Sequence, residues 1–422
     1  MEFYEHLQKE YDTNTIKKLQ EEENKQRTYC VILNVNKYNE NIIKDKIIEK
    51  HPFVKNGYYI DKNIGYDYLF SNGVYYYQDA GSMMAAYFLN PDENDIILDM
   101  CAAPGGKTID IALKLKNKGL IISNDVNYSR AKTLSNNIEN LGFANVFVTC
   151  NDLDKIKNFY KYTFDKIILD APCSGSFMFR KNEEAAKDWN IEKVKKYAIE
   201  QEKLLEIADI LLKEDGILYY STCSLSKEEN EYQIQNFLKN HAGEYELIEL
   251  NNENKFYDGI NNTGIYMMPF MYKCEGQYIC ILKKVCKTPL FFAKNSYFNK
   301  NNLLKNIDLK FKYETDDGVY LFNNHLNMKY FNTLRYGLKV YDIYNKKITP
   351  SLSLARYLDN LNSINLDENQ FLKYIKGEIL TFSNDIKIKE GFNIVSYNGI
   401  NLGFVKVKNN IAKNLYPKKL RI

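Results

Sequence analysis

Two cysteines lie in short segments whose composition favours chemistry. Cys173 belongs to Asp170-Ala171-Pro172-Cys173-Ser174-Gly175, and Cys223 belongs to Ser221-Thr222-Cys223-Ser224. Each segment directly follows an apolar run of the kind that predicts a buried strand. A free cysteine is most often an ordinary buried residue, but Pro, Ser and Gly neighbours at the exit of a strand indicate an accessible thiol. We therefore predict that both cysteines are functional.

A turn rich in small residues comes earlier in the chain. Asp99-Met100 leads into Cys101, Ala102, Ala103, Pro104, Gly105, Gly106, Lys107 and Thr108. Small residues let the backbone approach a ligand closely, and free amides at the start of the following helix suit a carboxylate. The end of this segment resembles a P-loop, but that motif needs a glycine at the position of Cys101. We therefore interpret the turn as a cofactor loop and exclude a P-loop.

Acidic residues follow two more of the predicted strands. Asp125 comes after the second strand, at the spacing used to bind ribose hydroxyls, and Asp152 comes after the third, where it would meet an adenine amino group. Either acid alone is more often a loop or cap residue. Because the carboxyl ends of parallel strands share one edge of a sheet, the two acids together favour a nucleoside cofactor.

These segments fit a doubly wound α/β sheet. Short apolar runs alternate with helical periodicity between residues 95 and 221, which is typical of a parallel sheet with crossover helices. Gly142 is placed to end a helix, and Ser226-x-x-Glu229 resembles a capping box that opens another. The predicted strands are 96–98, 120–122, 146–148, 166–169 and 217–220, with later ones at 264–268, 277–282, 393–396 and 403–407, and the predicted helices end near 115, 141 and 212, with a short one beginning near 350.

Bulk composition narrows the class of protein. A chain of 422 residues is too long for one ordinary core and predicts two or three domains. Its eight cysteines include no C-x-x-C pair, so neither a disulfide framework nor a metal site is favoured. The first residues lack an apolar signal core, and no apolar run is long enough to span a bilayer. We therefore expect a cytoplasmic protein that needs no membrane and no metal.

The formal net charge of +3 conceals an asymmetry. Residues 287–422 carry 22 Lys and Arg against 11 Asp and Glu, whereas the rest of the chain carries 35 against 43. A basic end attached to an acidic body suggests a polyanionic partner. On charge alone, a solvated lysine-rich face explains the same numbers equally well. The sequence contains no acidic residue after Glu390. The basic residues of this stretch are Lys406, Lys408, Lys413, Lys418, Lys419 and Arg421.

Further segments complete a resemblance to a known family. Residues 75–84 resemble its entry motif, residues 178–181 with Trp189 resemble a branch-specific stretch, and residues 350–355 and 413–418 resemble a PUA-like RNA-binding part. With the cysteine segments and the cofactor loop, they make the chain similar to the Sun-type RNA (cytosine-5) methyltransferases. The similarity is greatest to the RsmF-like branch, which modifies bacterial small-subunit ribosomal RNA.

The resemblance implies S-adenosyl-L-methionine as cofactor and RNA as partner, with ribosomal RNA preferred to transfer RNA. It implies that Cys223 adds to carbon 6 of cytosine, that Cys173 assists breakdown of the adduct, and that Asp170 binds the amino or ring-nitrogen edge of the base. We expect Lys107 and the sulfonium to favour the thiolate. The cofactor contacts would be the residues 101–107, Asp125, Asp152 and Asp170.

The same resemblance implies a domain order for what we expect to be a monomer. Residues 1–72 would form a small α/β accessory element, 73–286 a Rossmann-like S-adenosylmethionine-dependent methyltransferase domain, 287–306 a linker, and 307–422 a mixed α+β PUA-like region. The chain departs from the family at Ser176-Phe177, Ser224-Leu225 and residues 267–270. We expect these positions at the RNA-facing rim.

Three other functions stay open. The same chemistry on transfer RNA needs no change to the site, and a non-catalytic assembly factor could use this fold to bind ribosomal RNA. Methylation of DNA cytosine is a further alternative, because Pro172-Cys173 matches the nucleophile motif of the DNA enzymes. Cys223 and the basic tail argue against DNA.

Overall fold

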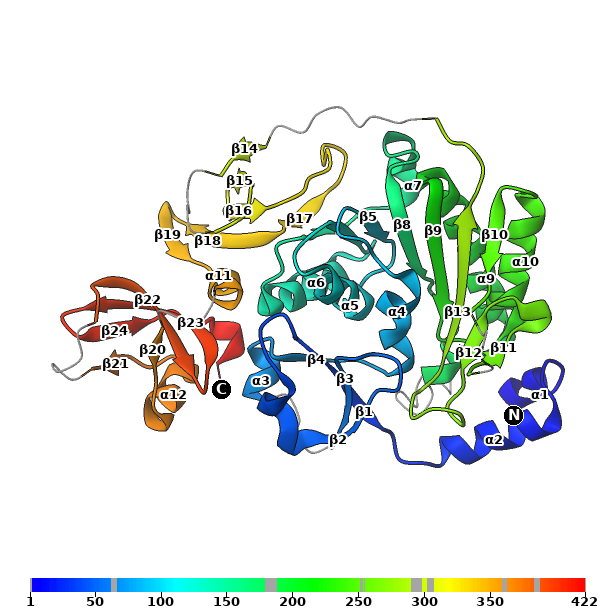
Figure 1. The fold of residues 1–422 in the computed structure, drawn as a ribbon, viewed down its shortest axis with the longest axis horizontal. Helices are drawn as coiled ribbons and strands as arrows, with labels where there is room; N and C mark the ends of the chain where they lie inside the picture. The colour runs from blue at the N-terminus through cyan, green and yellow to red at the C-terminus, as the bar shows by residue number, and fades with distance from the viewer. Residues whose placement is uncertain are drawn as a thin grey trace.

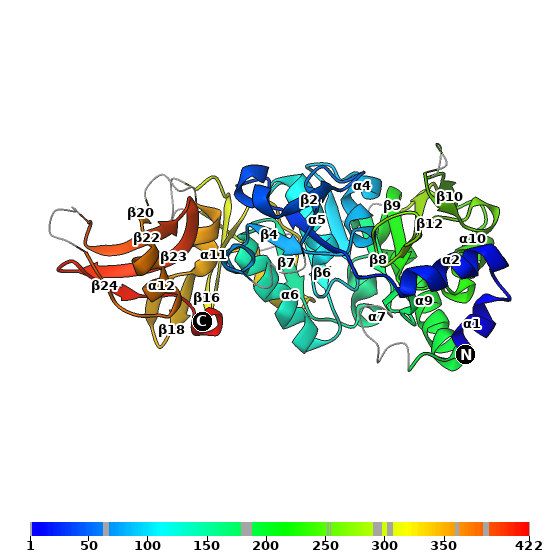
Figure 2. The ribbon, with the colours of Figure 1, turned by 90° about the horizontal axis from the view of Figure 1, so that it is seen from below.

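The chain forms an elongated molecule of three parts (Figures 1 and 2). This computed structural model describes residues 2–61, 67–178, 188–250, 253, 255–289, 298–301, 307–358, 363–382 and 388–421. A large sheet with helices on both faces occupies one end, a small N-terminal sheet lies beside it, and the C-terminal strands form the other end. Among the residues described, no helix is long and apolar enough to cross a lipid bilayer.

The predicted doubly wound sheet is confirmed. Its parallel core has the strand order β7-β6-β5-β8-β9, and β13 adds to β9 in the antiparallel sense. The predicted fifth strand is longer than expected, because β9 begins at Leu212. The strands are β5 Ile96–Asp99, β6 Leu120–Asn124, β7 Val146–Thr149, β8 Phe164–Asp170, β9 Leu212–Thr222 and β13 Gln277–Lys284.

Successive side chains of each strand point to opposite faces of the sheet, so each face has its own hydrophobic core. Leu98 and Ile122 belong to the cluster beneath the helices α9 and α10, whereas Ile97 and Ile121 belong to the cluster beneath α4, α5 and α6. Both faces are therefore covered, as buried parallel strands require. Gly142 ends α6 with a left-handed φ of 71°, as predicted. The helices are α4 Ala85–Leu89, α5 Gly106–Leu115, α6 Tyr128–Leu141, α7 Leu153–Ile156, α9 Ile191–Leu211 and α10 Glu231–Asn240.

Both edges of the sheet gain strands from outside its parallel core. The predicted later strands appear as β12 (Ile265–Met267) and β13, and β10 (Tyr245–Ile248) and β11 (Tyr257–Asp258) join them. At the opposite edge β17 (Thr333–Tyr336) pairs antiparallel with β7. The expected division at residues 286 and 306 stays a prediction, but the pairing of β17 crosses it, because a strand from beyond residue 307 joins the large sheet.

The N-terminal residues do not form one detached element. The strands β1 to β4 make a four-stranded sheet in the order β2-β3-β1-β4, while α1 and α2 extend to the far end of the molecule (Figure 2). Leu7, Ile16 and Leu19 lie in the hydrophobic cluster of the large sheet. The elements are α1 Glu2–Leu7, α2 Thr13–Glu23, β1 Tyr29–Leu33, η1 Glu40–Lys46, β2 Ile47–Lys50, β3 Gly57–Ile60, α3 Tyr68–Ser71, β4 Tyr75–Tyr77 and η3 Gly81–Met84.

The C-terminal part contains two five-stranded sheets and is mixed α+β, as predicted. The first comprises β14 Asn299–Lys300, β15 Phe311–Thr315, β16 Gly318–Phe322, β18 Leu338–Tyr344 and β19 Lys347–Pro350. The second comprises β20 Ile364–Asn365, β21 Leu380–Thr381, β22 Gly391–Tyr397, β23 Ile400–Lys408 and β24 Ile411–Asn414, with the helices α11 Leu352–Tyr357 and α12 Glu368–Ile375 nearby. Because β14 pairs with β15, part of the expected linker belongs to a sheet.

The predicted capping box at Ser226 is wrong. The side chain of Ser226 caps no helix and bonds to Glu228 at 2.8 Å instead. A short 3-10 turn, η6 (Lys227–Glu229), precedes α10, and the Glu229 carboxylate turns inward to the loop after β8. The spacing of a capping box implies a local hydrogen bond to Glu229, but its carboxylate bonds instead to Ser174 in the loop after β8.

Candidate active site

Two cavities meet at the carboxyl ends of the parallel strands, where a doubly wound sheet binds its ligands. The larger has a volume of about 400 Å³ and the smaller about 240 Å³. The larger is within the size range of small-molecule sites. Both are lined by Cys101, Ala103, Asp170, Ala171 and Cys223. Cys223 therefore lies where the contents of the two cavities would meet.

The two cysteine sulfur atoms lie 3.2 Å apart. Their loops are adjacent because β8 and β9 pair in parallel up to Asp170 and Ser221. Past that pair, the Ala171 N–H donates to the Ser221 carbonyl at 2.9 Å. The expectation that the chain brings both cysteines together at one opening is met, since Cys173 lines the larger cavity beside Cys223.

The surroundings of Cys173 favour its protonated form. The hydrogen bond with Cys223 and burial raise the pKa of Cys173 well above its ordinary value. Either sulfur can be the donor in the contact between the two, and a protonated Cys173 can donate to Cys223.

Lys107 and Asp170 form an ion pair at the wall of the smaller cavity. The distance between Lys107 Nζ and Asp170 Oδ2 is 2.7 Å, and the Lys107 side chain is almost fully buried. The other carboxylate oxygen accepts hydrogen bonds from Ser221 at 2.7 Å and from Gln277 at 3.3 Å. Three groups thus fix the Asp170 carboxylate in one orientation. The role of Lys107 in favouring a thiolate stays a prediction, and its closest recorded partner is a carboxylate.

The cofactor loop leaves β5 and enters α5 as expected. Gly105 takes φ 117°, a left-handed value that favours glycine, and a Cβ atom there would lie 2.8 Å from Leu134. The residues of the loop that line one or both cavities are Cys101, Ala102, Ala103, Pro104, Gly106 and Lys107. Gly105 shapes the turn without lining either cavity.

The acids at the strand ends fit a nucleoside cofactor to different degrees. Asp125 is buried at the larger cavity, and one of its carboxylate oxygens is buried without a hydrogen-bond partner, although Arg130 lies 3.4 Å away. This oxygen forms an ion pair with Arg130 but accepts no hydrogen bond, so it can still accept one from a ribose hydroxyl. Asp152 also lines the larger cavity, but its carboxylate caps α7 by accepting from the Asp154 N–H at 3.1 Å. The residues present therefore fit the nucleoside end of S-adenosylmethionine.

From the sequence, Asp99 and Gln277 had no predicted functional role, and Glu229 was assigned only to a helix cap. Asp99 is buried beside the smaller cavity, accepts a hydrogen bond from Thr108 at 2.7 Å and keeps one oxygen without a hydrogen-bond partner. Burial raises the pKa of Asp99 to about 7. Its position at the head of the cofactor loop was the signal available. Gln277 and Glu229 carry no comparable local pattern, because their partners are distant in sequence.

Most of the positions that depart from the family lie in the core and not at the rim. Phe177 is 5% exposed and Leu225 is 3% exposed, while Met267 and Met268 are fully buried. Ser176 is also buried, and its hydroxyl accepts from the Leu225 N–H at 2.7 Å. These buried apolar side chains belong to the two hydrophobic cores of the sheet, whereas residues 269 and 270 are half-buried.

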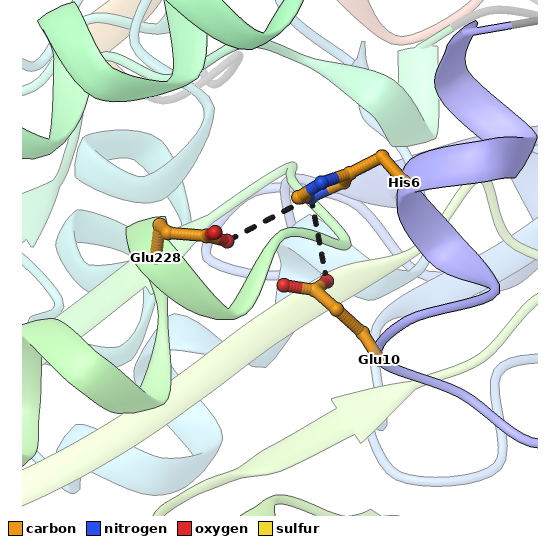
Figure 3. A group of neighbouring side chains, drawn as sticks. All are labelled: His6, Glu10 and Glu228. Atoms are coloured by element: carbon orange, nitrogen blue, oxygen red, sulfur yellow. Dashed lines mark ion pairs between the residues drawn. The ribbon is translucent and has the colours of Figure 1, made fainter.

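The first helix contacts the segment that follows Cys223. His6 Nε2 lies 3.5 Å from a carboxylate oxygen of Glu10 and 3.7 Å from one of Glu228 (Figure 3). It also lies 2.9 Å from the hydroxyl of Ser226. Burial and Glu228 raise the pKa of Glu10 to about 9, whereas that of Glu228 is lowered, in part by its hydrogen bond with Glu10. Glu10 is therefore the protonated member of this pair and donates a hydrogen bond to Glu228.

This pair predicts a stability that depends on pH. Unfolded Glu10 ionises near pH 4.5 and folded Glu10 near pH 9, so its contribution is complete below pH 4.5 and is lost as the pH rises through 9. In Glu10→Gln the side chain is neutral throughout. We expect the melting temperature of the wild type, relative to that of this variant, to fall by about 2 °C or more from pH 5 to pH 9. Thermal melts with exposed Glu21→Gln as the control test this, and a pH-independent difference would contradict it.

Two protein families match separate stretches of the chain. Residues 86–283 match the family described as 16S rRNA methyltransferase RsmB/F, and residues 361–422 match the methyltransferase RsmF PUA domain. The first match spans the parallel sheet. The second covers β20 to β24, so the sheet of β14 to β19 lies outside both matches.

Curated relatives match over most of the chain. The protein of Shewanella piezotolerans named ribosomal RNA small subunit methyltransferase F is 30% identical over 404 residues, which is 87% of this chain and 84% of the relative. The protein of the same name from Vibrio parahaemolyticus is 30% identical over 87% of this chain and 85% of its own length.

Solved structures with similar folds include a methyltransferase homolog protein and NSun6, both from Pyrococcus horikoshii. That homolog is 28% identical, with a TM-score of 0.55, and covers 66% of this chain and 97% of its own. The structure of PH0851 has 28% identity and a TM-score of 0.62, and the match spans 65% of its length, just under two thirds. NSun6 with SFG, at 23% identity and a TM-score of 0.60, covers 68% of this chain and 98% of its own and shows a shared fold.

Proposed function

Because this chain belongs to the 16S rRNA methyltransferase RsmB/F family, for which S-adenosylmethionine is the cofactor, we propose that it methylates carbon 5 of a cytosine in small-subunit ribosomal RNA, with Cys223 as the nucleophile. The observation that carries the proposal is the 3.2 Å distance between the Cys173 and Cys223 sulfur atoms at the junction of two cavities. A reaction at one pyrimidine carbon needs a nucleophile, a proton donor and a methyl source at one point.

The larger cavity suits the nucleoside part of the cofactor. Asp125 offers the ribose a carboxylate oxygen that accepts no hydrogen bond, and Asp152 lies at the end of the next strand. The backbone of residues 101–107 would lie along the cofactor, with Asp99 near its charged amino group. When bound, S-adenosylmethionine supplies a methyl group on a positively charged sulfur.

Cytosine carbon 5 is too weak a nucleophile to accept that methyl group unaided. Attack of Cys223 Sγ on carbon 6 forms a carbon–sulfur bond and gives carbon 5 enamine character. After methylation, loss of the carbon 5 proton to a base restores the ring double bond, and the carbon–sulfur bond breaks to return the thiolate. The covalent adduct thus replaces one difficult step by easier ones.

Asp170 and Lys107 suit recognition of the base in the smaller cavity. The Asp170 carboxylate is held by Lys107, Ser221 and Gln277 and can accept a hydrogen bond from the exocyclic amine of cytosine. Uracil has no amine there. A target base must leave its stack to enter this cavity, which is easiest in single-stranded or loop RNA.

The C-terminal charges support RNA as the partner. In the described part of the tail, Lys406, Lys408, Lys413, Lys418, Lys419 and Arg421 are all exposed, and Lys406 and Lys413 are cross-strand neighbours on β23 and β24. Exposed cations at this spacing can bind backbone phosphates, and such binding weakens as salt rises. This face lies in the segment that matches the PUA domain.

We further propose that the chain acts as a cytoplasmic monomer without a metal ion. Within the described ranges, two side-chain groups could hold a metal, namely His6, Glu10 and Glu228, and Asp209, His241 and Glu244. None of these six residues lines either cavity. Methylation in the presence of a chelator, and the elution volume of the active protein, test these two points.

The substrate class is tested by comparing acceptors. RNA labelled with tritium at cytidine carbon 5 releases the label on methylation. We expect release from 16S ribosomal RNA to exceed that from transfer RNA or DNA of equal cytosine content by at least about tenfold. An acceptor that cannot flip its base into the site reacts slowly. Bisulfite mapping locates the product. If the protein preferred transfer RNA or DNA, that nucleic acid would be its substrate. If the protein did not bind S-adenosylmethionine, a role as an assembly factor would be favoured.

A further inference from the structure

The carboxylate of Glu229 joins the two loops that carry the cysteines. Glu229 is fully buried in η6, six residues after Cys223. Its Oε1 atom accepts a hydrogen bond from the Ser174 N–H at 2.7 Å, and its Oε2 atom accepts from the hydroxyls of Ser174 and Ser224, both at 2.5 Å. Ser174 directly follows Cys173, and Ser224 directly follows Cys223.

The contacts of Glu229 do not belong to a salt bridge or a helix cap. Over the ranges that the structure describes, the other recorded partner of its carboxylate is Gln201, at 3.5 Å, and no Lys, Arg or His forms an ion pair with it. Burial raises the pKa of Glu229, and the hydrogen bonds from the serines lower it. A buried carboxylate without a cation is unfavourable unless donors surround it. Here the donors are the cysteine loops themselves.

The loops need a link beyond the sheet. The last paired residues of β8 and β9 are Asp170 and Ser221, so both cysteines lie past the end of the regular ladder. Two hydrogen bonds join the loops past this point, from the Phe177 N–H to the Cys223 carbonyl at 3.0 Å and from the Leu225 N–H to the Ser176 hydroxyl at 2.7 Å. Glu229 adds a charged connection one residue beyond each sulfur.

We propose that Glu229 is a positioning residue that fixes the spacing between the Cys173 and Cys223 sulfur atoms. The loops cannot separate without leaving the carboxylate or the serine donors buried and unpaired. The negative charge of Glu229 also raises the pKa of Cys173, which keeps this thiol protonated beside Cys223. The proposal deepens the proposed function and rests on it for the reaction, but the protonation of Cys173 can be measured without any substrate.

The first test compares Glu229→Gln with Glu231→Gln. Glu231 is a buried carboxylate two residues away whose partners are Tyr266 and the Ile260 N–H, so it matches Glu229 in burial but not in position. Iodoacetamide labelling of Cys173 is followed by peptide mass mapping between pH 7 and pH 10. At pH 8 we expect labelling at least about threefold faster in Glu229→Gln, because loss of the negative charge favours the Cys173 thiolate, and within twofold of wild type in Glu231→Gln. Equal rates in the two variants would overturn the proposal.

Glu229→Asp tests the length of the side chain separately from its negative charge. This variant remains informative if Glu229→Gln does not fold. The shorter side chain keeps the charge near Cys173 but cannot meet both serines. We expect labelling within twofold of wild type, kcat for methyl transfer at least about tenfold lower, and an unchanged KM for S-adenosylmethionine. An unchanged kcat would refute the positioning role. A labelling shift in Glu229→Gln, together with no methylation of any RNA by the wild type, would keep this role and refute the proposed function.

Discussion

Cys223→Ala should lower tritium release from carbon-5-labelled RNA by at least about 10³-fold, because the variant lacks the sulfur that makes carbon 5 reactive. The effect should appear in kcat, since the side chain forms a bond only during the reaction. Cys223 lies at the junction of the two cavities, with its sulfur 3.2 Å from that of Cys173. Tritium release and methyl incorporation, both with saturating S-adenosylmethionine, measure the same loss by two routes.

A matched control separates chemistry from thiol content. Cys286 is a partly exposed cysteine that lines neither cavity, so Cys286→Ala should retain wild-type activity within about twofold. Cys223→Ala should still bind S-adenosylmethionine, because the residues placed along the cofactor remain. Release of tritium at the normal rate by Cys223→Ala would remove the covalent role from this residue. If Cys223→Ala released tritium at the normal rate and Cys173→Ala released none, Cys173 would be the nucleophile.

The parts of the site that the sequence predicted are those held by one strand each. A buried parallel strand shows as an apolar run, and the residue at its end is placed by the strand alone. The position of Cys223 after β9 and that of Asp125 after β6 therefore follow from periodicity. The shared opening of the two cysteines follows as well, because strands that are neighbours in a doubly wound sheet end at the same edge.

The parts that escaped prediction depend on partners far apart in the chain. Glu229 matched a capping box in its spacing to Ser226, yet its hydrogen bonds reach Ser174, 55 residues away. The strand β17 joins β7 across nearly two hundred residues, so no local pattern assigns it to the catalytic sheet. Phe177 and Met267 were placed at the surface by analogy, while the apolar character of their side chains indicated burial. Where the two conflicted, side-chain chemistry was the better guide.

Cys173→Ala should accumulate a covalent complex between the protein and its RNA. In the wild type the Cys173 thiol lies 3.2 Å from Cys223 Sγ and retains its proton, so it can donate to that sulfur as the bond to carbon 6 breaks. Alanine offers no donor, and the departing thiolate is left without stabilisation. Formation of the adduct needs only Cys223 and should proceed. With RNA and S-adenosylmethionine present, we expect at least about tenfold more denaturant-resistant complex than in the wild type.

The location of the trapped bond decides between this assignment and others. The double variant Cys173→Ala with Cys223→Ala should form no complex, because the nucleophile is absent. Cys173→Ser restores a weak donor at nearly the same position, so its complex should accumulate less than that of Cys173→Ala. A complex in the double variant would place the bond on another residue. Turnover by Cys173→Ala at the wild-type rate, with no trapped RNA, would show that the departing Cys223 sulfur needs no help from its neighbour.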